Sequence, residues 1–406
     1  MADRTLKSWK NDTSGNVIML FSLVLIPILL VAAFAVDNSR QISADRHLQA
    51  AIDAASLAGA RALEDATKTD AEIQSIAQNA FLANLETTHD DVACTNADIT
   101  IDRNLGTVNV ASDCTVNTMF GQSLSPETMS VATAATAQAN VTKLDLALML
   151  DVSGSMGGQK LIDLKTAAIN AANELVTPNT GDRVRVSFVS YATSVNAGAY
   201  GNPALGRPAN DDSDGDGLDK VCVSERVGSA AWKDDEPEIG KWVGDDASSC
   251  PNSSLLPLTN DLDLFETEIN KLTASGWTAG HLGIAWSWYL IAPDWDDIWP
   301  NASKPLGYTE PHTIKAVILM TDGQFNTAYE GSHGNSNQQA RKMCDKMRDE
   351  GVLVYSVAFQ APTAAKNTLK DCAGGEERFF DAGNGQELLD AYAVIASQLS
   401  ALTLVD

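Results

Sequence analysis

The feature that most constrains the fold is a nearly unbroken apolar run at residues 144–150. A run of this length and composition is typical of a parallel strand that is buried on both faces. A polar loop with Asp151, Ser153 and Ser155 follows it at once. Apolar positions at helical spacing over residues 159–176 come next. The pattern therefore predicts a strand, a loop and a helix, and open α/β sheets bind their ligands at the carboxyl ends of such strands.

Two later stretches offer side chains of the same kind. Residues 276–280 form a second glycine-punctuated loop, which contains Thr278 and precedes a predicted helix at residues 282–290. Residues 316–320 predict another buried strand, which Asp322 follows closely. Two carboxylates and three hydroxyls supply only oxygen ligands, and these suit a hard divalent cation.

Together the three loops resemble the metal-ion-dependent adhesion site of von Willebrand factor A-type domains, in which D-x-S-x-S is followed by a Thr and then an Asp. The resemblance implies an α/β fold that binds Mg²⁺, or else Mn²⁺ or Ca²⁺. It implies that the metal site consists of Asp151, Ser153, Ser155, Thr278 and Asp322. Each loop alone would also fit an ordinary helix N-cap or an Asp-Gly turn, but their order and context favour the metal site.

The rest of this region, residues 143–406, alternates between predicted strands and helices. Such alternation predicts a doubly wound, mainly parallel α/β sheet covered by helices on both faces. The expected elements after the first helix are a strand at 183–191, a helix at 337–350, a strand at 352–359, a short helix near 368, a strand at 378–380 and a helix at 386–399. A long insertion is expected at about 195–258.

The insertion contains an acidic run that resembles a calcium loop, with a candidate second site at Asp212, Asp214 and Asp216. The twelfth position counted from Asp212 is Val223, where an EF-hand has a bidentate Glu. A solvated acidic loop is therefore the favoured interpretation. Seven of the eight tryptophans lie between positions 232 and 299, where they would form a partner-binding rim or, as we favour, pack the insertion onto the domain.

A membrane anchor is predicted at residues 17–36, which are twenty consecutive uncharged and mostly apolar residues. A helix of that length would rise about 30 Å and cross a bilayer. Because Arg4, Lys7 and Lys10 precede it, residues 1–16 are expected in the cytoplasm and everything after Asp37 is expected to be exported. A cleaved signal peptide is the alternative, since residues 33–35 have the A-x-A form; the long apolar run and its helical continuation favour an uncleaved anchor.

The Gly at position 15 with its apolar sequel, and the Ala-rich run at 48–58, resemble the N-terminal segment of TadG-type proteins. These belong to the bacterial Tad (tight adherence) system, which assembles Flp pili. Related pilin-like subunits carry a Glu on the fifth residue after the processing Gly, whereas this chain has Leu20, which favours a permanent anchor. The resemblance implies a bacterial inner-membrane protein whose bulk is periplasmic or on the cell surface.

Between the anchor and the larger domain, residues 37–142 predict a helical stalk with a small pilin-like α+β region. Apolar residues at helical spacing indicate a helix at 70–85. Alternation indicates a hairpin over 99–110 and a further strand at 131–141. No catalytic chemistry is evident in this region.

The six cysteines fall into three sequence-local pairs without any C-x-x-C motif. An even count of this kind favours disulfides in an oxidising compartment, although the sequence alone does not fix their connectivity. The sequential pairing that we favour is Cys94–Cys114, Cys222–Cys250 and Cys344–Cys372. The last pair corresponds to one in the final helices of TadG-like proteins.

A formal net charge of −25 argues against nucleic-acid binding, because such a surface repels phosphates. The chain has no G-x-S-x-G elbow around Ser153 or Ser155, and its five histidines are scattered, so we expect no enzyme and no small-molecule substrate. We expect an exported, metal-dependent protein-binding module of Tad pilus assembly or adhesion, whose cation binds a carboxylate of a pilus-assembly or extracellular protein. The alternative is a structural pilus-associated subunit in which the metal only stabilises the fold.

Overall fold

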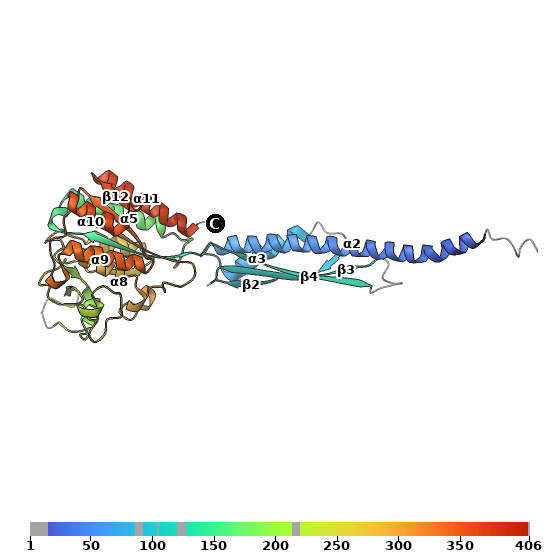
Figure 1. Cartoon of the computed structure of the whole chain (residues 1–406), viewed down its shortest axis with the longest axis horizontal. Helices are drawn as coiled ribbons and strands as arrows, with labels where there is room; N and C mark the ends of the chain where they lie inside the picture. The colour runs from blue at the N-terminus through green and yellow to red at the C-terminus, as the bar shows by residue number, and fades with distance from the viewer. Residues whose placement is uncertain (1–14, 86–91, 104, 120–126, 213–219, 405–406) are drawn as a thin grey trace, which may run out of the picture. The chain divides into compact units, whose positions relative to one another are not determined.

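The computed structural model describes residues 15–85, 92–103, 105–119, 127–212 and 220–404. The chain divides into two compact units, residues 1–139 and 140–406, which are described separately (Figure 1). We refer to them as the first and the second unit.

The first unit begins with one long helix, α2 (Gly15–Leu63), which contains Pro27. From Leu20 to Val36 its apolar side chains are exposed on all sides, with Leu23 75% and Phe34 63% exposed. From Asp37 onward the same helix buries one face against its own unit. Among the described residues α2 alone is long and apolar enough to cross a membrane, judged by length and composition.

Helix α3 (Asp70–Leu85) and an antiparallel sheet complete the first unit. The strands are β1 (Val92–Cys94), β2 (Asp98–Asp102), β3 (Thr107–Asn117) and β4 (Thr128–Gln138). β4 pairs with β3 along its whole length, while β1 and β2 share the other edge of β3. Alternate residues of β3, among them Val108 and Val110, are buried with α2 side chains such as Leu48, so one face of the sheet carries the core.

The second unit has an eight-stranded sheet. Its strands are β5 (Lys143–Asp151), β6 (Val184–Tyr191), β7 (Val195–Asn196), β8 (Cys222–Val223), β9 (Leu256–Thr259), β10 (Thr313–Thr321), β11 (Leu353–Phe359) and β12 (Phe379–Ala382). The order β12-β11-β10-β5-β6 is parallel throughout, and β7, β8 and β9 add antiparallel pairs at the β6 side. The predicted mainly parallel sheet is thus confirmed.

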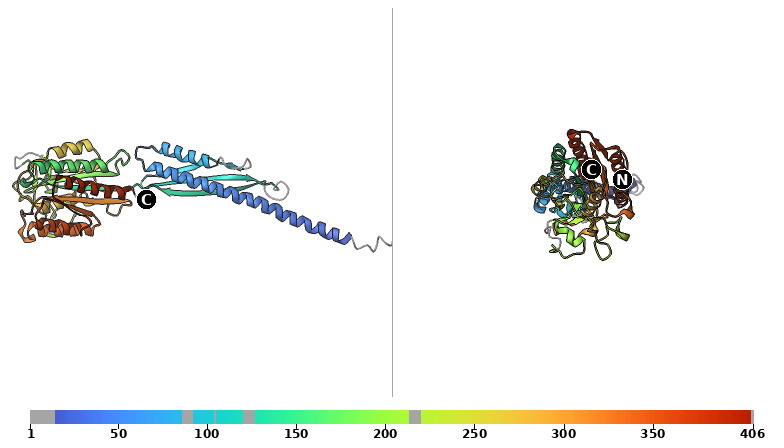
Figure 2. Two further views of the ribbon diagram at one scale, coloured as in Figure 1. Left: turned by 90° about the horizontal axis from the view of Figure 1, so that it is seen from above. Right: turned by 90° about the vertical axis from the view of Figure 1, so that its left-hand side faces the viewer.

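Helices cover both faces of this sheet (Figure 2). The bounds of the longer ones are α5 (Gln159–Leu175), α7 (Leu262–Asn270), α8 (Gly280–Tyr289), α9 (Ser336–Asp349), α10 (Thr363–Ala373) and α11 (Gly385–Leu404). Residues of α5, α7 and α11 form one apolar core, and residues of α8, α9 and α10 form the other. Strand β5 serves both, because Leu146 and Leu148 enter the first core while Ala147 and Met149 enter the second.

The insertion after β6 contains β7, β8 and short helical turns, and the chain returns to the sheet at β9. The turns in the second unit are η1 (Gly154–Met156), η2 (Gly198–Tyr200), α6 (Gly201–Ala204), η3 (Gly228–Ala230), η4 (Pro293–Trp295), η5 (Asn301–Ser303) and η6 (Gly331–His333). Of the candidate calcium residues, Asp212 is exposed, whereas Asp214 and Asp216 lie outside the described residues. The calcium site therefore stays a prediction.

Most of the clustered tryptophans pack inside the second unit. Trp286, Trp288, Trp295 and Trp299 are buried, and Trp232 and Trp242 are partly buried. Trp295 stacks on Tyr289, and the buried guanidinium of Arg226, from the insertion, lies 5.4 Å from the Trp295 ring centre. These rings join the insertion to the body of the unit.

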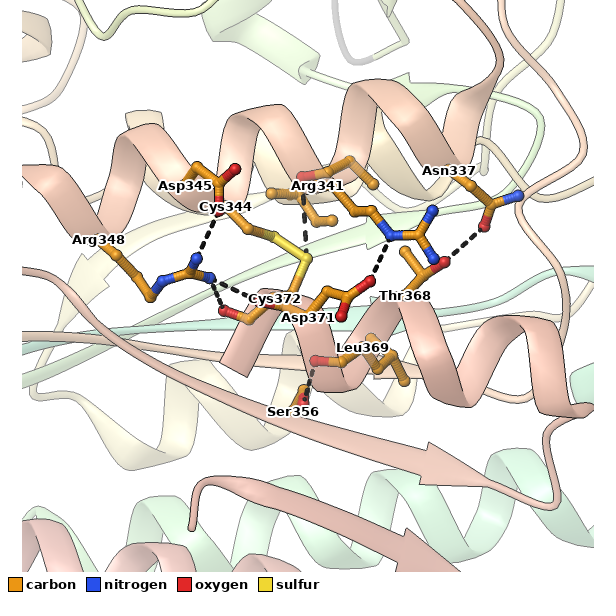
Figure 3. Close-up of a disulfide and its surroundings, with 12 residues drawn as sticks. Asn337, Arg341, Cys344, Asp345, Arg348, Ser356, Thr368, Leu369, Asp371 and Cys372 are labelled. Atoms are coloured by element: carbon orange, nitrogen blue, oxygen red, sulfur yellow. Dashed lines mark hydrogen bonds and ion pairs between the residues drawn. A yellow bond between two sulfur atoms is a disulfide. The ribbon is translucent and has the colours of Figure 1, made fainter. Parts of the chain in front are cut away.

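Disulfides join the three cysteine pairs that the sequence order favours, Cys94–Cys114, Cys222–Cys250 and Cys344–Cys372. The last one links α9 to α10 (Figure 3). Beside it, Arg341 of α9 donates to the Asp371 carboxylate of α10 over 2.6 Å, so an ion pair reinforces the same contact.

Three charged residues lie side by side in the middle of the second sheet. Asp145 of β5 is fully buried and stands opposite Arg185 of β6 and Lys315 of β10. Its carboxylate accepts hydrogen bonds from Arg185 Nη2 at 2.6 Å and from Lys315 Nζ at 3.2 Å. Burial lowers the pKa of Lys315, and the Asp145 charge opposes that shift. Removing Asp145 would leave a buried cation without its counter-charge.

We therefore expect Asp145→Ala to lower the free energy of unfolding by about 3–5 kcal/mol, the range for breaking one partner out of a buried ion pair. Urea unfolding of the full chain in detergent, followed by tryptophan fluorescence, reports on the second unit because seven of the eight tryptophans lie there. Asp349→Ala, which removes an exposed ion pair with Lys346, is the control and should change stability by less than about 1 kcal/mol. If both variants lost the same free energy of unfolding, the buried row of Asp145, Arg185 and Lys315 would not contribute the expected stability.

Candidate metal centre

The carboxyl ends of two adjacent strands bring the predicted metal residues together. Asp151 is the last residue of β5, and Asp322 directly follows β10. The two strands run parallel with Met149 opposite Leu319, so their loops leave the sheet at the same edge. Thr278 lies just before α8 and is buried like both carboxylates.

The Asp151 carboxylate is held from two sides. Its Oδ1 accepts the Ser153 backbone N–H at 2.8 Å. Its Oδ2 accepts the Thr321 hydroxyl at 2.6 Å and the Tyr191 hydroxyl at 3.1 Å. Asp151, Thr321 and Tyr191 are all 0% exposed, so this carboxylate has a fixed position inside the protein.

Hydroxyl groups connect the first loop to the third. Ser153 Oγ lies 3.0 Å from Ser155 Oγ, and Ser155 Oγ donates to Asp322 Oδ1 over 2.6 Å. The other oxygen of Asp322, Oδ2, accepts from Lys160 Nζ at 2.7 Å. A continuous line of oxygen atoms therefore runs from the first loop to the second carboxylate.

The Thr278 loop is tied to both of the others. The Gly154 N–H donates to the Gly276 carbonyl at 3.0 Å, which joins the first and second loops. The Thr278 N–H donates to Asn326 Oδ1 at 3.0 Å, and the Asn326 N–H donates back to the Thr278 carbonyl at 2.9 Å. A Cβ placed on Gly323 would lie 3.8 Å from Ser155 Oγ and 3.9 Å from Thr278 Oγ1. The five predicted residues thus lie on three loops that hydrogen bonds connect to one another, and the Thr278 loop is connected through backbone groups and Asn326.

This donor set fits a hard divalent cation. Burial raises the pKa of Asp151, and the charge of Asp322 raises it further, while hydrogen bonds from Ser153 and Thr321 oppose the shift. Two buried carboxylates that repel one another form a place where a cation is favoured. Within the described part of the chain no three His, Cys, Asp or Glu side chains gather as metal ligands, so hydroxyls would have to complete the coordination here.

Trp277 projects beside the network. Its side chain is 68% exposed, in contrast to Thr278, which is 4% exposed. The Trp277 N–H donates to Thr193 Oγ1 at 3.0 Å. Gly276 has φ +83°, and a Cβ there would come within 2.5 Å of Thr193 Oγ1, so only glycine fits. The backbone is held firmly while the indole points outward.

The sequence predicts the candidate metal ligands but not the residues that form hydrogen bonds to them. Tyr191 ends a predicted strand and looked like an ordinary core residue; Thr321 stands next to Asp322, and that position alone was a usable signal. Lys160 and Asn326 gave no signal, because their contacts cross 162 and 48 residues of sequence.

His281 lies three residues after Thr278, in the first turn of α8. It is buried, with Nδ1 2.7 Å from Ser336 Oγ and Nε2 2.7 Å from Glu225 Oε1. Glu225 Oε1 also accepts the Tyr329 N–H at 2.8 Å. The insertion is thereby joined to the N-terminal end of α8, next to the Thr278 loop. Burial alone would raise the pKa of Glu225, but the hydrogen bond and charge of His281 outweigh it and lower that pKa to about 2.

Because the folded-state pKa of Glu225 lies below its unfolded value of about 4.3, the stabilisation is present at pH 7 and is lost as the pH falls from about 4.3 toward 2. We expect Glu225→Gln to lower the free energy of unfolding at pH 7 by about 2–3 kcal/mol. The difference between variant and wild type should shrink below pH 4 in urea titrations followed by tryptophan fluorescence. Glu238→Gln, at an exposed pair with Lys241, is the control; a difference that is constant with pH would refute this account.

Comparisons with known proteins find similarity in one segment of the sequence and among solved structures. A family model of Flp pilus-assembly TadE/G-like proteins matches residues 15–62. No curated protein matches the chain.

Solved structures that are similar to this chain include pilus proteins and a byssus protein. The von Willebrand factor domain of the type V pili tip protein Mfa5 from Porphyromonas gingivalis is 12% identical with a TM-score of 0.41, covering 65% of this chain and 97% of that one. The pilus adhesin SpaC from Lactobacillus rhamnosus GG is also 12% identical with a TM-score of 0.41, covering 76% of this chain and 34% of that one. Proximal thread matrix protein 1 from the mussel byssus, with a zinc-occupied MIDAS motif, is 15% identical with a TM-score of 0.34, covering 64% and 46%.

The chain spans about a third of the length of the SpaC adhesin. The fold of the second unit is defined by its own strand order. The family match covers the long helix α2 and none of the second unit. Over residues 15–62, the N-terminal segment of this chain is similar to TadE/G-like Flp pilus-assembly proteins.

Proposed function

We propose that this chain is a membrane-anchored, exported protein-binding module of the Tad pilus system that uses a divalent cation to bind a carboxylate of a partner. The observation that carries the proposal is the connection of Asp151 to Asp322 at one edge of the sheet, through the backbone N–H and hydroxyl of Ser153 and the hydroxyl of Ser155. Ser155 and Trp277 are exposed at that edge, where a partner could approach.

Asp151, Ser153, Ser155, Thr278 and Asp322 would hold the cation, with Mg²⁺ as the first candidate and Mn²⁺ or Ca²⁺ as others. When bound, the cation supplies a Lewis-acid position that accepts a carboxylate oxygen. The chain's own residues fix the two carboxylates through Thr321, Tyr191 and Ser155 and keep the donor atoms oriented before any ligand arrives. These residues would act in binding and not in catalysis.

The membrane part of the proposal is supported by α2. From Leu20 to Val36 it exposes apolar side chains on every side, as a lipid-facing helix would. The charges of Arg4, Lys7 and Lys10 support a location of residues 1–16 on the cytoplasmic side of the inner membrane, with the bulk of the chain periplasmic or on the cell surface. Three disulfides agree with an oxidising compartment. Pilus-assembly or extracellular proteins would then be the partners.

A second candidate function is a structural subunit in which the cation only stabilises the loops. The hydrogen bonds that tie the three loops to one another favour it, since a cation there would strengthen contacts that already exist. The two functions differ in whether a coordination position stays open to a partner.

The metal itself is tested by thermal unfolding of the full chain in detergent with Mg²⁺, Mn²⁺, Ca²⁺ or EDTA, followed by tryptophan fluorescence. At about a hundred times its dissociation constant, a cation should stabilise the wild type by about 2.7 kcal/mol. Asp151→Asn should lose this response, and Asp349→Asn should keep it. A wild type that responds to no cation would refute the metal site. A calcium response that survives in Asp151→Asn would point instead to the loop at 212–216.

Binding is distinguished from a structural role by Trp277. Because aromatic side chains often anchor interfaces, we expect Trp277→Ala to abolish or strongly reduce pilus-dependent adhesion while the protein accumulates normally and keeps its cation response. Trp277→Phe should retain much of the activity. Ile239→Ala, at an insertion residue that is 91% exposed, is the matched surface control. Normal adhesion in Trp277→Ala would favour the structural subunit.

A further inference from the structure

Lys160 occupies an unusual place for a basic side chain. It is the second residue of α5, which begins at Gln159 after the N-cap Gly158. The N-terminus of a helix carries a partial positive charge, so a lysine in the first turn is electrostatically unfavourable there. Gly158 also provides no side chain to cap the helix. A local anion is needed to offset this arrangement.

That anion is Asp322. Lys160 Nζ lies 2.7 Å from Asp322 Oδ2, and the Asp322 side chain is completely buried while that of Lys160 is 26% exposed. The Lys160 ammonium also lies 5.9 Å from the centre of the Phe359 ring. Since Asp322 Oδ1 accepts from Ser155, one oxygen of Asp322 faces the hydroxyl network and the other faces the ammonium.

The pairing changes the charge of the site. Asp151, Asp322 and Lys160 together carry a formal charge of −1. A divalent cation would bring that sum to +1, whereas the same two carboxylates without Lys160 would be neutralised to zero. In a partly buried site of low effective dielectric, one residual positive charge favours an anion in the open coordination position. The same ammonium competes with the metal for the negative potential of Asp322.

We propose that Lys160 is the residue that makes the metal centre selective for an anionic partner: it weakens binding of the cation alone and strengthens binding of a carboxylate to the loaded site. This inference rests on the proposed function, because it assumes that a cation binds between the three loops. It predicts effects of opposite sign on two affinities from a single substitution.

The test uses the full chain in detergent and three variants. Mn²⁺ binding is measured by titration calorimetry. N-acetyl-aspartate amide is then titrated into the Mn²⁺-loaded protein, and its binding is followed by the loss of water-proton relaxation enhancement; N-acetyl-asparagine amide is the uncharged probe. Lys160→Met should bind Mn²⁺ about three- to tenfold more tightly and the aspartate probe about three- to tenfold more weakly. Lys160→Arg should resemble the wild type.

Lys165→Met is the matched control, because Lys165 lies on the same helix but donates to the Asn270 carbonyl. It should leave both affinities unchanged. A Lys160→Met chain that binds Mn²⁺ more weakly would overturn the proposal and show that Lys160 merely supports Asp322, and unchanged affinities would overturn it too. A wild type that binds no Mn²⁺ refutes the proposed function instead. The Lys160–Asp322 pairing is then still measured by the loss of stability of Lys160→Met in EDTA.

Discussion

The parallel pairing of β5 with β10 is the constraint on which the second unit depends. It places Asp145 opposite Lys315 in the interior and brings Asp151 close to Asp322 at the carboxyl edge. A buried carboxylate in the middle of a sheet is tolerated only in one register, since a slip by one residue would direct it to the other face and away from its cations. The Asp145, Arg185 and Lys315 charges therefore fix the alignment that the proposed metal centre requires. Stability and binding in this unit share one set of strand contacts.

Hydrogen bonds from residues outside the predicted ligand set also organise the candidate site. Tyr191 and Thr321 fix Asp151, and Asn326 fixes the backbone around Thr278. The Glu225–His281 pair connects the insertion to the end of α8 that carries this loop. A partner that contacts the insertion would therefore contact a segment that is hydrogen-bonded to the first turn of α8, next to the loop that carries Thr278. Among the acidic residues of the chain, Asp151 and Asp322 are the two that belong to the predicted ligand set.

Much of this arrangement could be predicted because long periodic segments are strong signals. The helix expected at residues 70–85 has those bounds, and the buried runs at 144–150 and 316–320 lie within β5 and β10. β9 was missed because it is only four residues long and includes Pro257, and α7 because nine residues give little periodicity. The tryptophan count indicated a cluster, but burial depends on tertiary neighbours, so the exposure of Trp277 was not predictable. The role of Lys160 required a contact with a residue far along the chain.

The long helix of the first unit has a mechanical consequence. α2 runs without interruption from its bare apolar half into the half that packs on β3 and β4, and its 49 residues correspond to about 70 Å of helix. A pulling force on the sheet would be transmitted along the helix axis to the apolar segment, because α2 contains no loop between its two halves. Pro27 has no N–H to donate, so the backbone ladder lacks a hydrogen bond there. The first turn to yield under load would be the one at Pro27, inside the apolar half and away from the folded sheet.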